Sequence, residues 1–391
     1  MHILEIPSFF PPYGGLFCLD QAKALAALGH EVRILSNVQL GMTIGWKDFL
    51  TLPYGRYEHQ VDSITVLQSY QRGMPKCIRH NAERWVAIVQ SMFGDYVRKY
   101  GRPDALHAHC AKWAGYAAML ISRQYHIPYV VTEHLPLMLL EQEFGKAPSD
   151  TWQIALLKET YQRAGMVVPV SEELVDDIAC YYGKDYHWQY VSNTIDTDFY
   201  HFKKREPLEG RAFRFCCLAD YYYRKGYDVL FDAMRQLQQT GVRAELHVAG
   251  LFTDSHACKE QIERLGLKDV MCYGRLDKRG VRNLLYRSDA LVLASRSEVQ
   301  PLVLLEAMAT GIPVISTECV PRCQRLSGCS IVPIGDAEAL ARAMRQAVEQ
   351  PVTDGKLYAE QVVGLASPAV VGRQLEAIFR SLVSSATYSE R

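Results

Sequence analysis

The chain has 391 residues, of which 49% are hydrophobic and 22% charged, a soluble globular balance in a chain long enough for two domains. Lysine plus arginine and aspartate plus glutamate each total 43, so the net charge gives no reason to expect a nucleic-acid partner. The 11 cysteines are dispersed, and the closest cluster, Cys319, Cys323 and Cys329, lacks zinc-finger spacing, so we expect cytoplasmic thiols and no metal site.

The chain begins with MHILEIP, which lacks the basic region and the cleavage site of a signal peptide, so we expect none. No apolar run approaches the roughly 18 uncharged residues of a membrane-spanning helix. Residues 2–6 predict a strand and residues 16–28 a helix. Between them, Gly14 and Gly15 would let the backbone approach a ligand at the helix start, although a plain tight turn explains the same dipeptide.

The rest of the N-terminal half alternates between predicted strands and helices, with an irregular stretch between residues 36 and 63. The expected strands and helices are strands at 31–36, 63–68, 105–108, 129–131, 166–169 and 189–191, and helices over 112–125 and from 172. His134 directly follows one of these strands, at the edge where open α/β sheets bind ligands. A lone histidine is nevertheless more often a hydrogen-bonded structural residue.

Residues 72–102 carry a local basic excess, with seven lysines and arginines against two acidic residues. Apolar residues from Trp85 to Val97 recur there at helical spacing, which predicts an amphipathic helix. Such a helix can lie on an anionic membrane surface. More often its apolar side packs on a sheet and its basic side stays in solvent.

The charged, irregular segment 201–211 is the best candidate for a linker. Just before it, Asp196 and Asp198 form an Asp-x-Asp pair that matches the metal-binding motif of another class of sugar transferases. The pair lies at the domain junction rather than at a strand end within a sheet. We therefore expect a structural turn there and no metal.

The alternation of strands and helices restarts after the linker. The expected elements are strands at 213–218, 244–249 and 270–273, and helices at 226–239, 256–265, 281–287, 337–348 and 368–383. The loop after the first of these strands ends in Arg224 and Lys225, at the entrance of a helix. Two cations in that position suit a diphosphate, and the alternative is a solvated helix cap.

The stretch from 288 to 317 has the most specific local pattern. The apolar run 290–294 predicts a strand buried on both faces, and Pro301 stands where the next helix begins. Gly311 ends that helix, and 314–317 reads as the next strand. This order places a polar loop at the carboxyl end of a strand.

The helix start in this stretch predicts an anion site. The backbone amides near Leu302 and Val303, together with the helix dipole, suit a group such as a diphosphate. Glu298 lies in the preceding loop and Glu306 within the helix. On either side of an anion site, these carboxylates look like acceptors for the hydroxyls of a sugar and a ribose.

Two alternating halves joined by a linker predict an α/β protein with two doubly wound, Rossmann-like domains that face a central cleft. We expect the N-terminal domain at 1–200 and the C-terminal domain at 211–366. A helix within 367–391 is a candidate to cross back to the N-terminal domain.

Together these motifs resemble the retaining glycosyltransferases of family 4, which share the two-domain GT-B fold. The most specific match is Glu298-x7-Glu306 within S-x-x-E…P-x-V-L-L-E-A-M-A-x-G-x-P-V-I. The supporting matches, which span nearly the whole chain, are Pro12-x-Gly14-Gly15, Gly29-His30-Glu31-Val32, Thr132-Glu133-His134, Val170-Ser171, Asn193-x-Ile195-Asp196 and Lys225-Gly226-Tyr227-Asp228.

The resemblance implies transfer of a hexose-type sugar from a UDP- or GDP-linked donor to a hydroxyl acceptor, in polysaccharide or glycoconjugate assembly. It implies retention of configuration and no metal or other cofactor. The N-terminal domain would be the acceptor side and the C-terminal domain the nucleotide-sugar side. Gly14 and Gly15 would line the junction of donor and acceptor.

Position by position, the resemblance also implies roles for single residues. Glu306 would hold the ribose hydroxyls, Lys225 would neutralise the diphosphate, and His134 would contact the sugar. Glu298 would meet the sugar and diphosphate together with the backbone of Val299, Gln300, Pro301, Leu302 and Val303. His134, Lys225 and Glu298 are thus the candidates for catalytic roles, with front-face attack favoured over a covalent route through Glu298.

The sequence departs from the family pattern at three places. Ala219 stands where an arginine is usual, and Arg224 is the nearest substitute for it. Thr194 replaces a glycine, and Cys319-Val320-Pro321 replaces a Gly-Gly turn. The change at Ala219 supports an alternative, a catalytically weak scaffold or sugar-nucleotide-binding protein.

An isomerase or a phosphorylase on a similar scaffold is a further alternative. We expect a cytoplasmic protein, with peripheral contact with the inner, anionic face of the cell membrane left open. The sequence predicts neither the donor sugar, the acceptor nor the oligomeric state.

Overall fold

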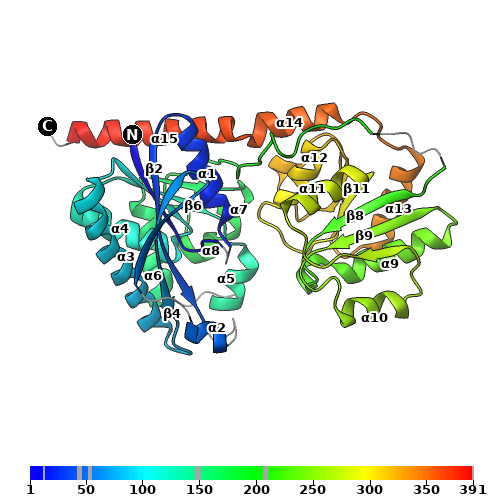
Figure 1. Ribbon diagram of the computed structural model, residues 1–391, viewed down its shortest axis with the longest axis horizontal. Coiled ribbons are helices and arrows are strands. Elements are labelled where there is room, and N and C mark those ends of the chain that lie inside the picture. Colours follow the sequence, from blue (N-terminus) through cyan, green and yellow to red (C-terminus); the bar gives the residue numbers. More distant parts are fainter. Residues whose placement is uncertain (12–13, 42–45, 52–54, 146–150, 206–209, 390–391) are drawn as a thin grey trace. The chain divides into compact units, whose positions relative to one another are not determined.

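The computed structural model describes residues 1–389 except 12–13, 42–45, 52–54, 146–150 and 206–209. By its internal contacts the chain divides into two compact units, which Figure 1 shows in sequence colours. Unit 1 consists of Met1–Thr194 and Pro368–Arg391, and unit 2 of Ile195–Ser367. Each unit is built on one largely parallel sheet, so the predicted class, two doubly wound α/β domains, is confirmed.

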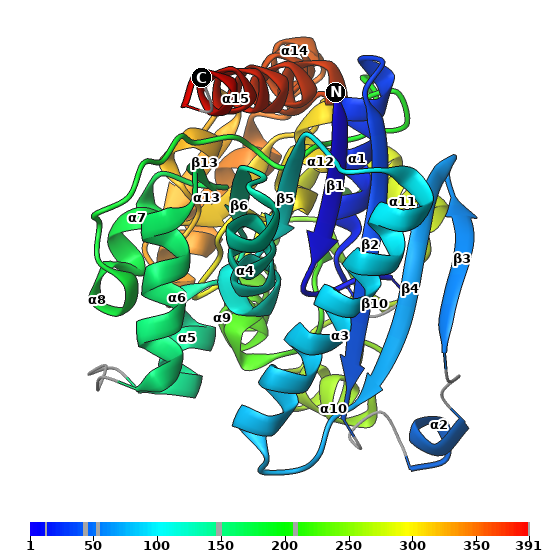
Figure 2. The same cartoon turned by 90° about the vertical axis from the view of Figure 1, so that its left-hand side faces the viewer.

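Unit 1 has a seven-stranded sheet in the order β3-β4-β2-β1-β5-β6-β7. Its strands are β1 (His2–Pro7), β2 (Glu31–Leu40), β3 (Arg56–Val61), β4 (Ile64–Arg72), β5 (Ala105–His109), β6 (Tyr129–Glu133) and β7 (Met166–Pro169). Only β3, at the edge beside β4 in Figure 2, runs antiparallel to its neighbour. The chain winds outward from β1 to β4 and then returns to β5 on the other side of β1. The change of direction between β1 and β5 is where open α/β sheets bind ligands.

The helices of unit 1 cover this sheet. They are α1 (Leu16–Ala27), α2 (Trp46–Thr51), α3 (Ile78–Tyr100), the π-helical turn η2 (Ala111–Gly115), α4 (Tyr116–Tyr125), α5 (Leu137–Phe144), α6 (Trp152–Arg163), α7 (Glu173–Asp177), α8 (Ala179–Tyr182) and α15 (Pro368–Ser389). In α3, Trp85, Val89 and Phe93 are buried, while Arg79 pairs with Glu83 on the exposed side. The apolar side of the basic segment 72–102 therefore belongs to the core.

The C-terminal helix α15 packs on α1 within unit 1, as the red and blue helices of Figure 1 show. The two helices approach closely at Gly372, where an added Cβ would lie 2.9 Å from the carbonyl oxygen of Ala24. His30 Nε2 also lies 3.1 Å from the Glu376 carboxylate. The apolar side of α15, including Leu375 and Phe379, is buried in the core of unit 1.

One stretch among the described residues, Lys356–Ser385, is long and apolar enough by length and composition to cross a membrane. It comprises α14 (Lys356–Ala366) and most of α15. A core helix of a globular protein passes the same test, and α15 is such a helix because Leu375 and Phe379 are buried in the core of unit 1. The stretch is therefore weak support for a membrane span.

Unit 2 has a six-stranded, fully parallel sheet in the order β10-β9-β8-β11-β12-β13. Its strands are β8 (Phe213–Leu218), β9 (Ala244–Ala249), β10 (Val270–Cys272), β11 (Ala290–Leu293), β12 (Val314–Thr317) and β13 (Cys329–Val332). Its helices are η3 (Tyr223–Lys225), α9 (Tyr227–Gln239), α10 (His256–Arg264), α11 (Lys278–Arg287), α12 (Leu302–Ala309), η4 (Arg322–Gln324), α13 (Ala337–Glu349) and α14. The winding direction changes between β8 and β11, so the loops that follow these two strands lie side by side.

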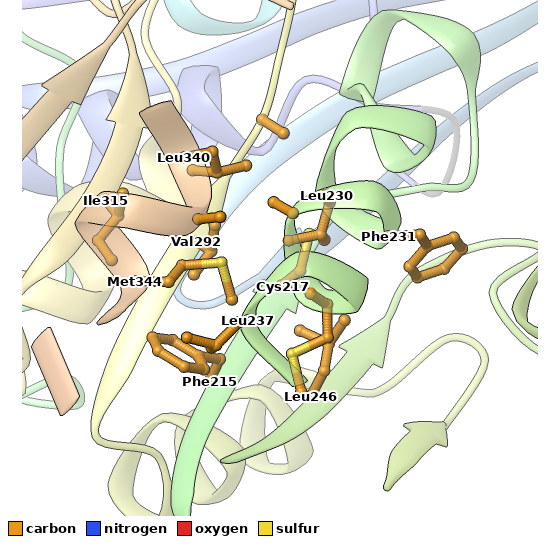
Figure 3. Close-up of a cluster of buried hydrophobic side chains, with 14 of the residues drawn as sticks. Phe215, Cys217, Leu230, Phe231, Leu237, Leu246, Val292, Ile315, Leu340 and Met344 are labelled. Atoms are coloured by element: carbon orange, nitrogen blue, oxygen red, sulfur yellow. The ribbon is translucent and has the colours of Figure 1, made fainter. Parts of the chain in front are cut away.

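The central strands of unit 2 are apolar because both faces of the sheet are covered by helices. Figure 3 shows one of its cores, where Phe215 and Val292 of the sheet meet Leu230 of α9 and Leu340 and Met344 of α13. Burying each such side chain stabilises the fold by about 1.5–3 kcal/mol. This core holds the carboxyl ends of β8 and β11 in fixed positions.

Several sequence predictions need correction. Residues 189–191 form no strand, although the backbone amides of Gln189 and Val191 donate to the carbonyls of Val167 and Pro169 in β7. The residue before them, Trp188, forms an isolated bridge with Val167. The stretch expected to be irregular contains α2 and the edge strand β3, whose residues are largely exposed and so lack apolar alternation. The Pro12-Tyr13 part of the predicted glycine turn and part of the linker, 206–209, lie outside the described residues.

The Asp-x-Asp pair does form a turn. Asp196 Oδ1 accepts a hydrogen bond from the backbone amide of Phe199 at 3.1 Å, and its Oδ2 lies 2.7 Å from Lys278 Nζ. A carboxylate engaged in this way closes a turn, so the predicted structural role of Asp196 is confirmed.

Candidate active site

The loops after β8 and β11 bring Arg224, Lys225 and Glu298 together in unit 2. Lys225 Nζ lies 2.5 Å from Glu298 Oε1, and Arg224 Nη1 lies 3.5 Å from Glu298 Oε2. Ser295 donates to Glu298 Oε1 at 2.6 Å. The Glu298 side chain is only 7% exposed and Lys225 17%, so this ion pair is largely removed from water. Arg224 thus lies beside Lys225 and also donates to the Ser297 carbonyl at 3.1 Å.

A glycine allows these two loops to approach each other. Gly226 has φ of +67°, and a Cβ added there would lie 1.9 Å from the carbonyl oxygen of Ala294. No other residue fits this position without displacing the backbone. Arg296 braces the same contact, because its guanidinium binds Asp228 with two hydrogen bonds and its amide donates to the Arg224 carbonyl.

The loop after β11 leads directly into α12. Pro301 precedes the first helical residue, Leu302, and the first amides of a helix have no partner within it. Gln300 and Pro301 are buried, whereas Leu302 and Val303 are half-buried at the helix start. The start of α12 therefore follows Glu298 as predicted, with its amides placed as an anion site requires.

Glu306 lies one turn further along α12, beside Tyr200. The Tyr200 phenol hydrogen-bonds the Glu306 carboxylate, and burial together with this carboxylate raises the pKa of Tyr200. Glu306 also lines a cavity of about 270 Å³ at the carboxyl ends of β8 and β9. Its carboxylate therefore borders a space in which hydroxyl groups could reach it.

The same cavity contains a cation that the sequence analysis missed. Arg275, in the loop after β10, lines it together with Ala219 and Glu306. Arg275 is largely exposed, and its sequence signal is only its position after Gly274 at a strand end. The cavity next to the position of the missing arginine thus has another arginine at its wall.

In unit 1, Gly14 and Gly15 lead from the end of β1 into α1. Both have positive φ, of +103° and +78°, and a Cβ on Gly15 would lie 2.0 Å from the carbonyl oxygen of Phe9. Gly15 is therefore required by a close backbone approach. The pair stands at the amino end of α1, as the sequence predicts.

Glu133 holds the loop that carries His134. Its buried carboxylate accepts from the backbone amides of His134 and Leu135, both at 2.9 Å, and from the amide of Ala111 at 3.0 Å. The Tyr161 hydroxyl also donates to it at 2.5 Å. This one carboxylate therefore fixes the ends of β5 and β6 relative to each other.

His134 is not a lone histidine. Its Nε2 lies 3.2 Å from Nδ1 of His109, whose Nε2 lies 2.7 Å from the carboxylate of Glu5 on β1. Phe17 of α1 stacks on the His134 ring with 3.7 Å between ring centroids. Burial, and next His109, lower the pKa of His134 well below its usual range, so the ring is neutral near pH 7.

Glu5, His107 and His109 form a fully buried group on β1 and β5. His107 Nδ1 lies 2.9 Å from the same Glu5 oxygen but is not aligned as a hydrogen bond, and its Nε2 bonds Thr132 Oγ1 at 2.7 Å. Burial alone would raise the pKa of Glu5. The neighbouring His107 and His109 have the larger, opposite effect and lower the pKa of Glu5 to about 2. Among the described residues, this group alone has metal-ligand spacing, which sequence spacing did not indicate.

A cavity of about 580 Å³ lies at the carboxyl edge of the sheet of unit 1. Its apolar lining includes Phe9, Ile78, Trp85, Trp113, Leu139 and Leu140. Gln39 and Gln142 are among its polar residues, and the ion pair of Lys112 with Glu143 lies at its wall. Leu135, which follows His134, also lines it. This cavity has the size and the mixed lining of a small-molecule site.

Comparison with known proteins identifies both halves of the chain. A family model described as Glycosyltransferase Family 4 matches residues 14–199. A second, described as Glycosyl transferases group 1, matches residues 212–350. The two models thus fall on the parts of the chain that form unit 1 and unit 2.

Individual proteins are similar over nearly the whole length. The glycogen synthase of Mycobacterium tuberculosis is 28% identical over 379 residues, which cover 90% of this chain and 87% of that protein. Sucrose-phosphate synthase from Thermosynechococcus elongatus has a similar structure, with a TM-score of 0.75, 19% identity and coverage of 98% and 100%. Anabaena HepE in complex with UDP-glucose matches with a TM-score of 0.71, 16% identity and the same coverage. The chain therefore belongs to the family 4 glycosyltransferases and has the GT-B fold.

Proposed function

We propose that this glycosyltransferase moves a hexose-type sugar from a nucleoside-diphosphate sugar to a hydroxyl acceptor, with retention of configuration and without a metal ion. The observation that carries the proposal is the cluster of Lys225, Arg224 and Glu298 beside the start of α12. We expect the acceptor to belong to polysaccharide or glycoconjugate assembly, since one relative is named a glycogen synthase.

The cluster in unit 2 suits the charge changes of the reaction. As the bond from the sugar C1 to the diphosphate oxygen breaks, negative charge grows on the leaving phosphate. Lys225, Arg224 and the first amides of α12 would stabilise that charge, and removing one preorganised donor typically costs about 3 kcal/mol. The leaving phosphate would take the proton of the attacking hydroxyl in a front-face reaction. Glu298 would orient the sugar and hold Lys225 in place.

We assign the nucleotide to the 270 Å³ cavity of unit 2, with Glu306 as the acceptor for the ribose hydroxyls. UDP is the first donor nucleotide to test, because HepE is described in complex with UDP-glucose. Arg275 at the cavity wall would supply a positive charge that Ala219 cannot. GDP-linked sugars form the second group of candidates.

We assign the acceptor to the 580 Å³ cavity of unit 1. Gln39 and Gln142 offer hydrogen-bond donors and acceptors for hydroxyl groups. Trp113, which is half-buried at the cavity wall, offers a flat apolar surface on which the C–H side of a sugar ring can lie. A saccharide acceptor fits this combination of lining residues.

A donor panel tests the proposed function directly. The full chain is incubated with UDP- and GDP-linked hexoses and mixed saccharide acceptors, and release of the nucleoside diphosphate is measured. We expect acceptor-dependent release with at least one donor. Binding of a donor without any release would instead favour the scaffold or sugar-nucleotide-binding alternative.

Glu306→Gln should weaken donor binding more than it slows chemistry. A carboxylate accepts from two ribose hydroxyls, whereas an amide offers one acceptor oxygen. Charge-assisted hydrogen bonds contribute about 1.5–3 kcal/mol, so the donor KM should rise roughly tenfold or more. Tyr200→Phe, which removes only the neighbouring phenolic hydroxyl and keeps the Glu306 carboxylate, serves as the control and should change KM little. An unchanged donor KM in Glu306→Gln would remove the ribose assignment.

Excess EDTA should leave the transferase activity intact. The carboxylate of Asp196 is occupied by Lys278 and by the Phe199 amide, and the positive charge at the diphosphate comes from Lys225 and Arg224. Initial rates before and after chelation provide the measurement. Activity that is lost on chelation and restored by Mn²⁺ or Mg²⁺ would contradict metal independence.

We further propose a cytoplasmic location, because the 11 cysteines are dispersed through a large chain rather than arranged as a disulfide framework. Any contact with an anionic membrane through α3 would be electrostatic, because the apolar side of this helix is buried. Arg84 and Arg79 remain exposed on its other side. Sedimentation with vesicles that contain phosphatidylglycerol, at low and high salt, tests this contact.

A further inference from the structure

We propose that Glu5 acts through His109 as a positioning residue that fixes the tautomer and the plane of His134, so that His134 Nδ1 accepts a hydroxyl hydrogen bond from the bound sugar. The inference rests on the proposed function, since it takes the sugar to be the ligand of His134. It adds a role for Glu5 and His109, two residues that no family motif discussed above includes.

The direction of each hydrogen bond follows from the charge of Glu5. An ionised carboxylate only accepts hydrogen bonds, so His109 must carry its proton on Nε2, 2.7 Å from Glu5 Oε2. Because burial, and next His107, lower the pKa of His109 to about 4, the ring is neutral near pH 7 and its Nδ1 is a bare acceptor. His134 must then donate from its Nε2, 3.2 Å away.

This chain of donors leaves one ring nitrogen without a protein partner. The neutral His134 ring, protonated at Nε2, has a bare Nδ1, and this buried atom has no hydrogen-bond partner among the described residues. An unsatisfied buried acceptor costs about 1–3 kcal/mol, so a ligand hydroxyl that pairs with it gains binding energy. The unpaired Nδ1 is therefore the acceptor that we assign to a hydroxyl of the bound sugar.

The packing around the relay fixes its geometry. Phe17 stacks on His134, and the His109 and His134 rings are nearly parallel, with 17° between their planes. Glu5 and His109 are fully buried on neighbouring strands, where β1 and β5 pair in register. The carboxylate is thus held by the sheet itself, at the position where the winding of the sheet changes direction.

Two variants of Glu5 separate its hydrogen-bonding role from its bulk. Glu5→Leu keeps the volume but removes the acceptor, so His109 and His134 lose their tautomer preference. Glu5→Gln can place its amide oxygen at the Oε2 position and retain the bond to His109. We expect Glu5→Leu to lower kcat/KM about tenfold, the value of one lost hydrogen bond, and Glu5→Gln to recover most of that loss.

Thr132→Val is the matched control. It removes the hydrogen bond of Thr132 to His107, a ring that lies beside Glu5 but makes no hydrogen bond to His109 or His134. Thr132→Val should lower the free energy of unfolding, because it leaves the buried His107 Nε2 without its hydrogen-bond partner, but it should leave kcat/KM unchanged. An equal fall in kcat/KM for Thr132→Val and Glu5→Leu would mean that the network is only structural, and would overturn the proposal.

Nuclear magnetic resonance of ¹⁵N-histidine-labelled protein tests the relay without any substrate. Long-range ¹H–¹⁵N spectra identify which ring nitrogen carries the proton, and His134→Gln assigns the signal. We expect the Nε2–H tautomer of His134 in the wild type and in Glu5→Gln, and its loss in Glu5→Leu. An unchanged His134 tautomer in folded Glu5→Leu overturns the relay, whereas absent transferase activity with this tautomer intact would count only against the proposed function.

The group Glu5, His107 and His109 also has the spacing of a metal site, so metal content must be measured in the same samples. The relay predicts less than a stoichiometric amount of zinc, iron or manganese in the purified full chain. One equivalent of metal that is retained by the wild type and lost in Glu5→Leu would replace the relay with a metal centre.

Discussion

Lys225→Ala is expected to lower kcat/KM at least a hundredfold, with most of the loss in kcat. Lys225 is the cation that matches the family motif, and its ammonium group lies in a largely buried ion pair with Glu298, 2.5 Å away. Removing one preorganised donor from a site that stabilises developing charge typically costs about a hundred- to a thousandfold. Steady-state kinetics with one donor measure the effect.

Two further variants calibrate this result. Arg224 is more exposed than Lys225 but reaches the same Glu298 carboxylate, so Arg224→Ala should cost about tenfold, comparable to one charge-assisted hydrogen bond. Lys259→Ala, which removes an exposed lysine of α10, should have no effect. A silent Lys225→Ala would contradict the mechanism proposed here. A silent Arg224→Ala would instead assign the role of the missing arginine to Arg275.

Gly226→Ala is expected to destabilise unit 2 and to reduce activity. The new Cβ would lie 1.9 Å from the Ala294 carbonyl oxygen, and the residue must keep φ of +67°. A left-handed conformation costs a non-glycine residue about 1–2 kcal/mol, and a clash with backbone adds about 1–3 kcal/mol. We therefore expect a loss of about 3 kcal/mol, measured by urea unfolding, and displacement of Lys225.

Gly241→Ala provides the control for the conformational part of this cost. Gly241 has φ of +78°, and an added Cβ would meet nothing within 4 Å. Its substitution should cost only about 1–2 kcal/mol and leave activity unchanged. If Gly226→Ala and Gly241→Ala lowered the free energy of unfolding equally, the two loops at Gly226 would not approach each other closely.

The stretch from 288 to 317 in unit 2 was predictable because each of its signals is local. The apolar run 290–294 contains the buried strand β11, Pro301 precedes a helix, and Gly311 ends it. These features constrain the backbone without help from distant residues. The close backbone approach at Gly15 and the start of α12 were predictable for the same reason, because their signals are also local.

Elements that depend on distant partners were not predictable. The edge strand β3 is polar and exposed, and only its pairing with β4 makes it a strand. Conversely, residues 189–191 make only two backbone hydrogen bonds to β7, beside the isolated bridge at Trp188, and are not part of a strand. Burial and pairing, rather than intrinsic propensity, decide both cases.

The candidate site was predictable only in part for the same reason. Lys225, Glu298 and Glu306 lie in motifs whose spacing is specific. Glu5 is a single acidic residue within an apolar strand, and its importance depends on the parallel register that places it opposite His107. Arg275 is brought to the wall of the 270 Å³ cavity by the order of three strands.

The central claim is that this chain transfers a sugar from a nucleoside-diphosphate donor with retention of configuration. Following a donor labelled with ¹³C at the sugar C1 by nuclear magnetic resonance, in the presence of a saccharide acceptor, tests it most directly. We predict a new C1 signal bonded to the acceptor oxygen, with the one-bond ¹³C–¹H coupling of the donor's anomeric configuration. An inverted configuration would contradict retention, a C1 that stays on the nucleotide after conversion would indicate an isomerase, and no change with any donor would contradict transfer altogether.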